Sequence, residues 1–248
     1  MPEANSQKVV AVVQARMGST RLPGKVLMDL RGEPMLTRVV ERLARAATLS
    51  AVVIATTTGT DDDAIAALCA RKGWSSFRGS EEDVLDRYYQ AARRAGAQIV
   101  VRVTADCPLI EPAIVDRTVQ EFIQRQPEID YASNTDPRRT FPQGLDTEVF
   151  RFDVLEKVWR EAREPSYREH VTLYIYRHPE IFHIHGVVND TDYSDHRWTV
   201  DTLEDYHLVC RIYEHFGHDR FSWRDVLAVL EANPQWRELN RHIQQKQV

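Results

Sequence analysis

The chain has 248 residues, of which 43% are hydrophobic, and carries a formal net charge of -5. This length can bury one sizeable core, so we expect a single domain over residues 1–248. The acidic balance argues against a nucleic-acid partner, because polyanion-binding proteins usually carry a net basic face. No apolar run approaches the roughly 20 residues that span a bilayer. With only three, widely spaced cysteines, the sequence predicts a cytoplasmic protein without a disulfide framework or a membrane partner.

Strand and helix signals alternate over the first 125 residues. The expected strands are 8–14, 51–56 and 98–103, and the expected helices begin near Pro34, Asp61, Ser80 and Pro112. This alternation is typical of a Rossmann-like α/β domain with a mainly parallel sheet. Open sheets of this kind bind ligands beyond the carboxyl ends of their strands. We therefore expect the loops 15–25 and 104–108 to be neighbours in space.

The alternation weakens after residue 130. The sequence predicts a loop feeding a strand at 141–150, helices at 153–162, 167–177 and 202–216, and strands at 181–188 and 197–200. We interpret about 130–190 as an inserted acceptor-binding or lid region, and 217–248 as a C-terminal helical segment. No linker or repeat separates these parts into further domains.

The segment 14–25 (QARMGSTRLPGK) follows the first predicted strand. It places three cations around two glycines, namely Arg16, Arg21 and Lys25 around Gly18 and Gly24. Such a loop can direct backbone N–H groups and positive charge toward one polyphosphate. It is not a Walker A loop, because five residues separate the glycines and Val26 stands where Ser or Thr would hold magnesium. Spacing alone leaves a solvated basic loop as the alternative.

The same loop resembles the signature of the cytidylyltransferases that make CMP-activated acidic sugars, and most closely the spore-coat-polysaccharide-type branch. Further stretches match in the family's order: 78–87 (RGSEEDVLDR), 102–110 (RVTADCPLI), 141–150 (FPQGLDTEVF), 169–172 (EHVT) with 176–179 (YRHP), and 197–206 (RWTVDTLEDY). The resemblance implies a fold of the nucleotide-diphospho-sugar transferase type. It also implies CTP as the nucleotide and a role in polysaccharide biosynthesis.

Two aspartates each follow a predicted strand, Asp106 after 98–103 and Asp201 after 197–200. If both strands end at one edge, the carboxylates can share a hard divalent cation, normally Mg²⁺, with nucleotide oxygens. The resemblance implies this metal role for both. The alternative is that one caps a turn and the other a helix. Ala105 and Leu203 depart from a glycine and a proline that are usual in the family.

The resemblance also assigns nucleotide and acceptor contacts. The nucleotide-binding set is Gln14, Ala15, Arg16, Gly18, Ser19, Lys25, Ser80 and Asp106, and the catalytic set is Arg16, Arg21 and Lys25. The acceptor-binding set is Arg138, Arg139, Glu148, Glu169 and His170. A loop with two arginines suits a carboxylate, phosphate or phosphonate, and a histidine can orient or deprotonate an acceptor. The alternatives are a helix cap for Ser80 and solvated surface charges for the acceptor set.

The implied reaction transfers CMP from CTP to an acidic sugar, a sugar phosphate or a phosphonate, and releases pyrophosphate. One alternative is a nucleotide-sugar-dependent glycosyltransferase on a related fold, which would normally show an Asp-x-Asp motif where this chain has Asp106-Cys-Pro. The other is a non-catalytic nucleotide-binding protein, which would not need all of Arg16, Lys25, Asp106 and Asp201. The sequence leaves a homodimer open.

Overall fold

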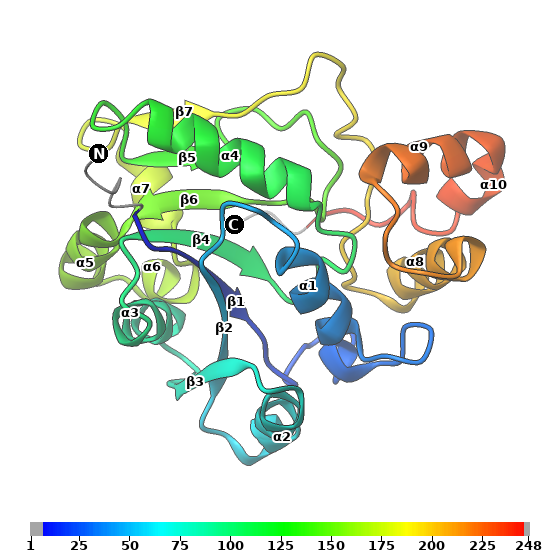
Figure 1. Ribbon diagram of the computed structural model, residues 1–248, viewed down its shortest axis with the longest axis horizontal. Helices are drawn as coiled ribbons and strands as arrows, with labels where there is room; N and C mark the ends of the chain where they lie inside the picture. The colour runs from blue at the N-terminus through cyan, green and yellow to red at the C-terminus, as the bar shows by residue number, and fades with distance from the viewer. Residues whose placement is uncertain (1–6, 246–248) are drawn as a thin grey trace, which may run out of the picture.

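A seven-stranded sheet lies at the centre of the computed structural model, which describes residues 7–245 (Figure 1). The strand order is β3-β2-β1-β4-β6-β5-β7. The bounds are β1 Val9–Gln14, β2 Ala51–Thr57, β3 Ser75–Gly79, β4 Ile99–Thr104, β5 Tyr131–Ser133, β6 Glu148–Arg151 and β7 Ile184–Gly186. Only β6 runs against the other strands of the described chain, since it pairs antiparallel with both β4 and β5. The predicted mainly parallel α/β sheet is confirmed.

Helices cover both faces of the sheet (Figure 1). One face carries α1 Met35–Leu43, α2 Asp63–Lys72 and α4 Pro112–Gln124, and the other carries α3 Val84–Arg94, α5 Phe152–Glu161, α6 Pro165–Glu169 and α7 Leu173–Arg177. The last helices, α8 Leu203–Phe216, α9 Trp223–Ala232 and α10 Pro234–Arg237, lie at one end of the sheet (Figure 1). Within residues 7–245, none combines the length and apolarity that a membrane span requires.

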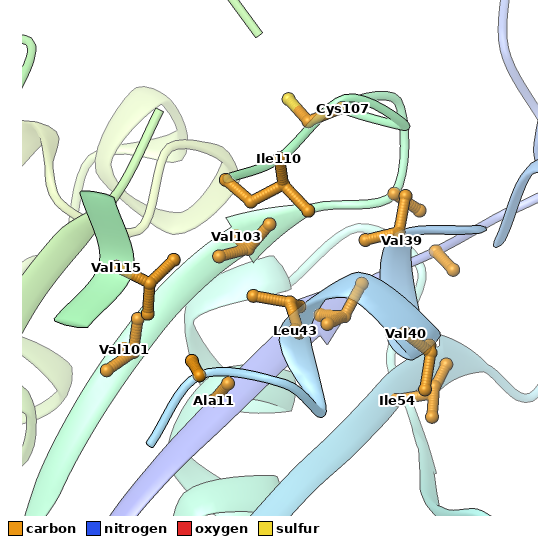
Figure 2. Packing of buried hydrophobic residues seen from close by; sticks show 14 of the residues in the cluster. Ala11, Val39, Val40, Leu43, Ile54, Val101, Val103, Cys107, Ile110 and Val115 are labelled. Atoms are coloured by element: carbon orange, nitrogen blue, oxygen red, sulfur yellow. The ribbon is translucent and has the colours of Figure 1, made fainter. Parts of the chain in front are cut away.

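The core follows from apolar runs that are buried on both faces of the sheet. β1 (VVAVVQ) is buried from Val9 to Val13, as expected for a central parallel strand that is covered by helices on either side. Figure 2 shows part of one layer, in which Val39 and Leu43 of α1 belong to the same cluster as Val103 of β4. This packing fixes the carboxyl ends of β1 and β4 side by side, in register from Val9 with Ile99 to Gln14 with Thr104.

Several local predictions were wrong, each for a physical reason. Residues 197–200 form no strand beyond an isolated bridge at Arg197, because Trp198 N–H donates to the loop at Gln143 and Val200 N–H to Asp106. The predicted helix 167–177 is broken between α6 and α7, because His170 adopts an extended backbone conformation with a ψ of 90°. Strand β3 (SSFRG) was missed because its polar, partly exposed residues give no apolar alternation. Strand β5 has only three residues, too few to leave a pattern.

The expected insertion continues the central sheet. β5, β6 and β7 extend it beyond β4, and α5, α6 and α7 pack on the same face as α3. The loop 134–147, which joins β5 to β6, therefore stands beside the end of β4, where the loop 104–108 begins.

Candidate active site

The loops that follow β1 and β4 meet at Lys25. Its Nζ atom donates hydrogen bonds to carboxylate oxygens of Asp106 and Asp201, both at 2.9 Å, and to the Val200 carbonyl at 2.7 Å. The predicted neighbourhood of the loops 15–25 and 104–108 is confirmed. The two aspartates also come together as predicted, although Asp201 follows an extended segment and not the predicted strand.

The conformation of the phosphate loop places Lys25 between these carboxylates. Gly24 has a φ of 71°, a left-handed value that favours glycine, and it begins a short 3₁₀ turn over Lys25–Leu27. Gly24 N–H donates to the Met17 carbonyl at 2.9 Å, which closes the loop. Met17 N–H in turn donates to the buried Asp62 carboxylate at 2.7 Å. Asp62 therefore ties the loop to the end of β2.

A cavity of about 440 Å³ opens above this junction. Five cationic side chains line it, Arg16, Arg21, Lys25, Arg87 and Arg102, together with three carboxylates, Asp106, Glu169 and Asp201. Gln14, Ala15, Ser19, Thr20, Val26, Val84, Thr104, Ala105 and His170 complete the lining. The cationic surplus and the size suit a polyphosphate ligand.

Asp201 is held by a buried network that extends away from the cavity. It pairs with Arg21 at 2.9 Å and with Arg197 at 2.8 Å in addition to Lys25. Arg197 is clamped by Asp205, whose side chain is fully buried and which also accepts a hydrogen bond from the Asp201 backbone N–H at 3.0 Å. From the C-terminal segment, Asn240 donates to Asp205 at 2.8 Å and to the Arg197 carbonyl at 2.9 Å. The position of Asp201 therefore depends on residues far beyond it in sequence.

Lys25 and Asp106 stay charged at neutral pH. Burial would lower the pKa of Lys25, but the charges of Asp106 and Asp201 outweigh burial and raise the pKa. Burial would likewise raise the pKa of Asp106, and the Lys25 charge with a hydrogen bond from Thr104 lowers it instead. The junction is therefore a compact group of one ammonium and two carboxylates.

The two carboxylates fit a hard divalent cation. Each places an oxygen 2.9 Å from the same ammonium, which stands in for a cation between them. Oxygen donors are the ligands that magnesium prefers, and in nucleotide enzymes one or two protein carboxylates suffice because phosphate oxygens and water supply the rest. No group of three or more candidate metal-binding side chains occurs among the residues that the structure describes. The arrangement therefore suits a cation shared with a phosphate ligand.

A second cavity of about 230 Å³ adjoins the first and shares Arg102, Thr104 and His170 with it. Its other lining residues are Val103, Thr135, Asp136, Arg139, Asp146, Glu148, Thr172 and Tyr176. Arg139 forms a two-pronged pair with Asp146, at 2.5 and 2.9 Å. Glu148 accepts hydrogen bonds from Arg102, Tyr131 and Thr172.

Most of the predicted site residues line one of the two cavities. Gln14, Ala15, Arg16, Ser19, Arg21, Lys25, Asp106, Glu169, His170 and Asp201 line the larger, and Arg139, Glu148 and His170 line the smaller. Three others, Gly18, Ser80 and Arg138, line neither. Ser80 accepts a hydrogen bond from Asp83 N–H just before α3, and the Arg138 side chain is 71% exposed beside Asp192.

Sequence reasoning missed several residues of the site. Arg102 and Thr104 lie two positions apart on β4, so they share a face that leads to Asp106, and this spacing could have indicated them. Arg87 reaches the larger cavity from the first turn of α3. Asp62 looked like an ordinary acid at a helix start, and nothing in the sequence links it to Met17.

Comparisons with known proteins agree with this geometry. The family model described as cytidylyltransferase matches residues 10–222. The spore coat polysaccharide biosynthesis protein SpsF of Bacillus subtilis is 33% identical over 91% of this chain and 95% of its own. The 3-deoxy-manno-octulosonate cytidylyltransferase of Geobacter sulfurreducens is 32% identical over 68% of this chain and 76% of its own.

A solved cytidylyltransferase from Leptospira borgpetersenii superposes with a TM-score of 0.90 at 36% identity, over 97% of this chain and 100% of that one. The match of fold and of sequence thus extends over both cavities and the loops that build them. This chain therefore belongs to the cytidylyltransferase family and is a CTP-dependent nucleotidyltransferase.

Proposed function

We propose that this enzyme transfers CMP from CTP to a small acidic acceptor, with Mg²⁺ as cofactor, and releases pyrophosphate. The observation that carries the proposal is the sharing of one cation, Lys25 Nζ, between Asp106 and Asp201 at the floor of a cationic cavity. That arrangement supplies what nucleotidyl transfer needs, which is compensation of phosphate charge next to a pair of carboxylates that can hold a metal.

In this reaction an acceptor oxygen forms a bond to the α-phosphorus, and the bond from that phosphorus to the bridging oxygen of the β-phosphate breaks. Pyrophosphate leaves with the bonding electrons. Arg16 and Arg21, from the loop after β1, would bind the phosphates. Lys25 would add charge compensation at the reacting end, because its ammonium is fixed beside Asp106 and Asp201. No covalent enzyme intermediate is needed.

Asp106 and Asp201 are the residues that would hold the metal. When bound there, a divalent cation supplies Lewis-acid compensation of charge on the phosphoryl oxygens. Arg197 and Asp205 keep the Asp201 carboxylate in place, because Arg197 bonds both acids. Thr104 does the same for Asp106 through a side-chain hydrogen bond. Arg197 and Asp205 outside the cavity and Thr104 on its wall thus position the two carboxylates.

We assign the acceptor to the smaller cavity, within the region 130–190 of the single domain that we propose. The two cavities share Arg102, Thr104 and His170, so a molecule in the smaller one can reach a nucleotide in the larger. His170 and Glu169 lie on the larger cavity beside this junction, where they would orient the attacking group. By relation to the spore coat protein and the octulosonate enzyme, we place the reaction in polysaccharide biosynthesis in the cytoplasm.

The test combines binding and turnover. Calorimetric titration with CTP, UTP, GTP and ATP, each with and without Mg²⁺, should show metal-dependent binding that is tightest for CTP. A pyrophosphate-release screen over sugar acids, sugar phosphates and phosphonates should then give turnover with acidic acceptors. Binding of a nucleotide sugar followed by sugar transfer would favour a glycosyltransferase, and tight CTP binding without turnover on any acceptor would favour a non-catalytic protein.

A further inference from the structure

The two adjoining cavities carry opposite charge. The larger has five cationic side chains against three carboxylates, whereas the smaller has two arginines, Arg102 and Arg139, against Asp136, Asp146 and Glu148. Charge compensation for phosphates is therefore concentrated on one side of the shared boundary. The other side has more carboxylate than cation.

Both arginines of the smaller cavity are already engaged. Arg139 makes its two-pronged pair with Asp146, which uses the fork that would otherwise grip a carboxylate or phosphate. Arg102 pairs with Glu148, and its other terminal nitrogen lies 3.4 Å from Gln14, a residue of the larger cavity. An incoming anion in the smaller cavity would therefore have to compete with these acids for each guanidinium.

The carboxylate oxygens of this cavity suit donors of hydrogen bonds. Burial raises the pKa of Asp136 most, and the charges of Glu148 and Asp146 raise it further against the opposing charge of Arg139. Burial, together with Glu148 and Asp136, raises the pKa of Tyr176 to about 12, so its hydroxyl keeps its proton. A second acid group placed here would be repelled, whereas a hydroxyl or ammonium would find carboxylate oxygens to bond.

We propose, on the basis of the proposed function, that the smaller cavity binds the hydrogen-bond-donating tail of the acceptor, a tail that carries hydroxyl or ammonium groups. The acid group of the acceptor then faces the cationic larger cavity and the α-phosphate. The acceptor has one acidic end only. Asp136 accepts hydrogen bonds from the tail, and a molecule with acid groups at both ends is rejected.

Three probes test this inference in pyrophosphate release. The first is 3-deoxy-manno-octulosonate, a sugar acid with a hydroxylated tail. The other two are phosphonates that differ in the tail: 2-aminoethylphosphonate carries an ammonium group and 3-phosphonopropionate carries a second acid. One or both of the first two should exceed the diacid in kcat/KM by about tenfold or more, because of charge repulsion in a partly buried site. The order of the first two probes in kcat/KM shows whether the cavity prefers a tail with hydroxyl groups or one with an ammonium group. If the diacid is used as well as the best of them, the inference is wrong.

Asp136→Asn provides the matched test, with Asp192→Asn as control, since Asp192 is a partly exposed acid that lines neither cavity. Asp136→Asn should lower the preference for the better mono-acid probe over the diacid by about tenfold and leave the KM for CTP unchanged. An unchanged preference would overturn the inference. If no probe turns over, calorimetric binding of the three probes to the complex with α,β-methylene CTP must give the same ranking. If the natural enzyme shows no metal-dependent binding of CTP, the proposed function itself is wrong.

Discussion

Lys25 and Asp201 are 176 positions apart in the chain, yet the ammonium of the first lies 2.9 Å from the carboxylate of the second. The same ammonium lies 2.9 Å from Asp106. A divalent cation between the two carboxylates would use the same oxygens. Lys25 and a metal bound there would therefore compete in the free enzyme, although we propose that both serve the nucleotide complex.

This competition gives a prediction for Lys25→Met. Without nucleotide the variant should bind Mn²⁺ more tightly than the natural enzyme, because two adjacent carboxylates lose their compensating charge. Turnover should nevertheless fall by about a hundredfold or more, since a contact to developing phosphate charge is lost. Electron paramagnetic resonance of free Mn²⁺ and pyrophosphate release are the measurements. Lys72→Met, a surface lysine paired with Glu33, is the control, and full activity of Lys25→Met would rule out the catalytic role.

The two aspartates should respond differently to amidation. Asp106→Asn and Asp201→Asn both remove a charge that we assign to metal binding, so each should lose about a hundredfold or more in metal-dependent turnover. Asp201→Asn should also unfold at a lower temperature, because Arg21, Lys25 and Arg197 all lose a charged partner there. Asp106 pairs with Lys25, so Asp106→Asn should unfold closer to the natural enzyme.

These measurements are pyrophosphate release against Mg²⁺ concentration and thermal unfolding without nucleotide. If the aspartates only cap a turn and a helix, asparagine would replace them well and activity would survive. Near-normal turnover of both variants at ordinary Mg²⁺ would therefore remove the metal assignment.

Asp62 should stabilise the phosphate loop in a pH-dependent way. Burial would raise the pKa of Asp62, but hydrogen bonds from Thr57, Met17 and Thr56 lower it below 3.8. A lowered folded-state pKa means that the stabilisation is complete above the unfolded pKa and is lost as the pH falls through the folded one. Asp62→Asn should thus cost about 1–3 kcal/mol of unfolding free energy at neutral pH. The difference should shrink toward about pH 3, below the unfolded pKa.

Urea unfolding of both proteins across this pH range is the measurement. Asp63→Asn is the control, because Asp63 is exposed and bonds Arg78 at the surface. CTP affinity should fall for the Asp62 variant alone, since Met17 loses its anchor. A pH-independent difference would mean that the carboxylate charge does not matter to the loop.

Asn240 should affect the site from a distance. Its side chain is buried and bonds both Arg197 and Asp205, which orient Asp201. Asn240→Leu removes one buried hydrogen bond from the Arg197 carbonyl and one from Asp205, so unfolding free energy should fall by about 1–3 kcal/mol, and the Mg²⁺ concentration needed for half-maximal turnover should rise. Arg241→Ala, on the exposed neighbour, should change neither. A variant that loses stability but keeps its Mg²⁺ dependence would show that the contact is structural only.

The sequence predicts the core of the site because local signals coincide there. A strand, a cationic glycine loop and an aspartate after the next central strand are each readable, and parallel topology brings their ends together. Asp201 lies beside Asp106 as predicted, although residues 197–200 are not a strand. This segment is hydrogen-bonded to the loops at Gln143 and Asp106, and both loops stand at that edge of the sheet.

The acceptor side was harder to predict because it depends on pairing. Arg138 and Arg139 are indistinguishable in sequence, yet one is exposed beside Asp192 and the other is locked to Asp146. Glu148 looked like a ligand contact, and three neighbours already occupy its oxygens. Whether a charge is available or neutralised is a property of tertiary contacts that no local pattern encodes.

The two cavities draw on separate parts of the chain. Apart from Val103, the residues that line only the smaller cavity fall between Thr135 and Tyr176, whereas the phosphate loop and Asp201 lie outside that stretch. Substitutions there can alter what is recognised without touching the groups that handle the triphosphate. If the acceptor binds there as we propose, a lineage could acquire a new acceptor while its nucleotide chemistry stays intact, and grafting the lining residues of this stretch between relatives is a direct route to enzymes that activate different acceptors.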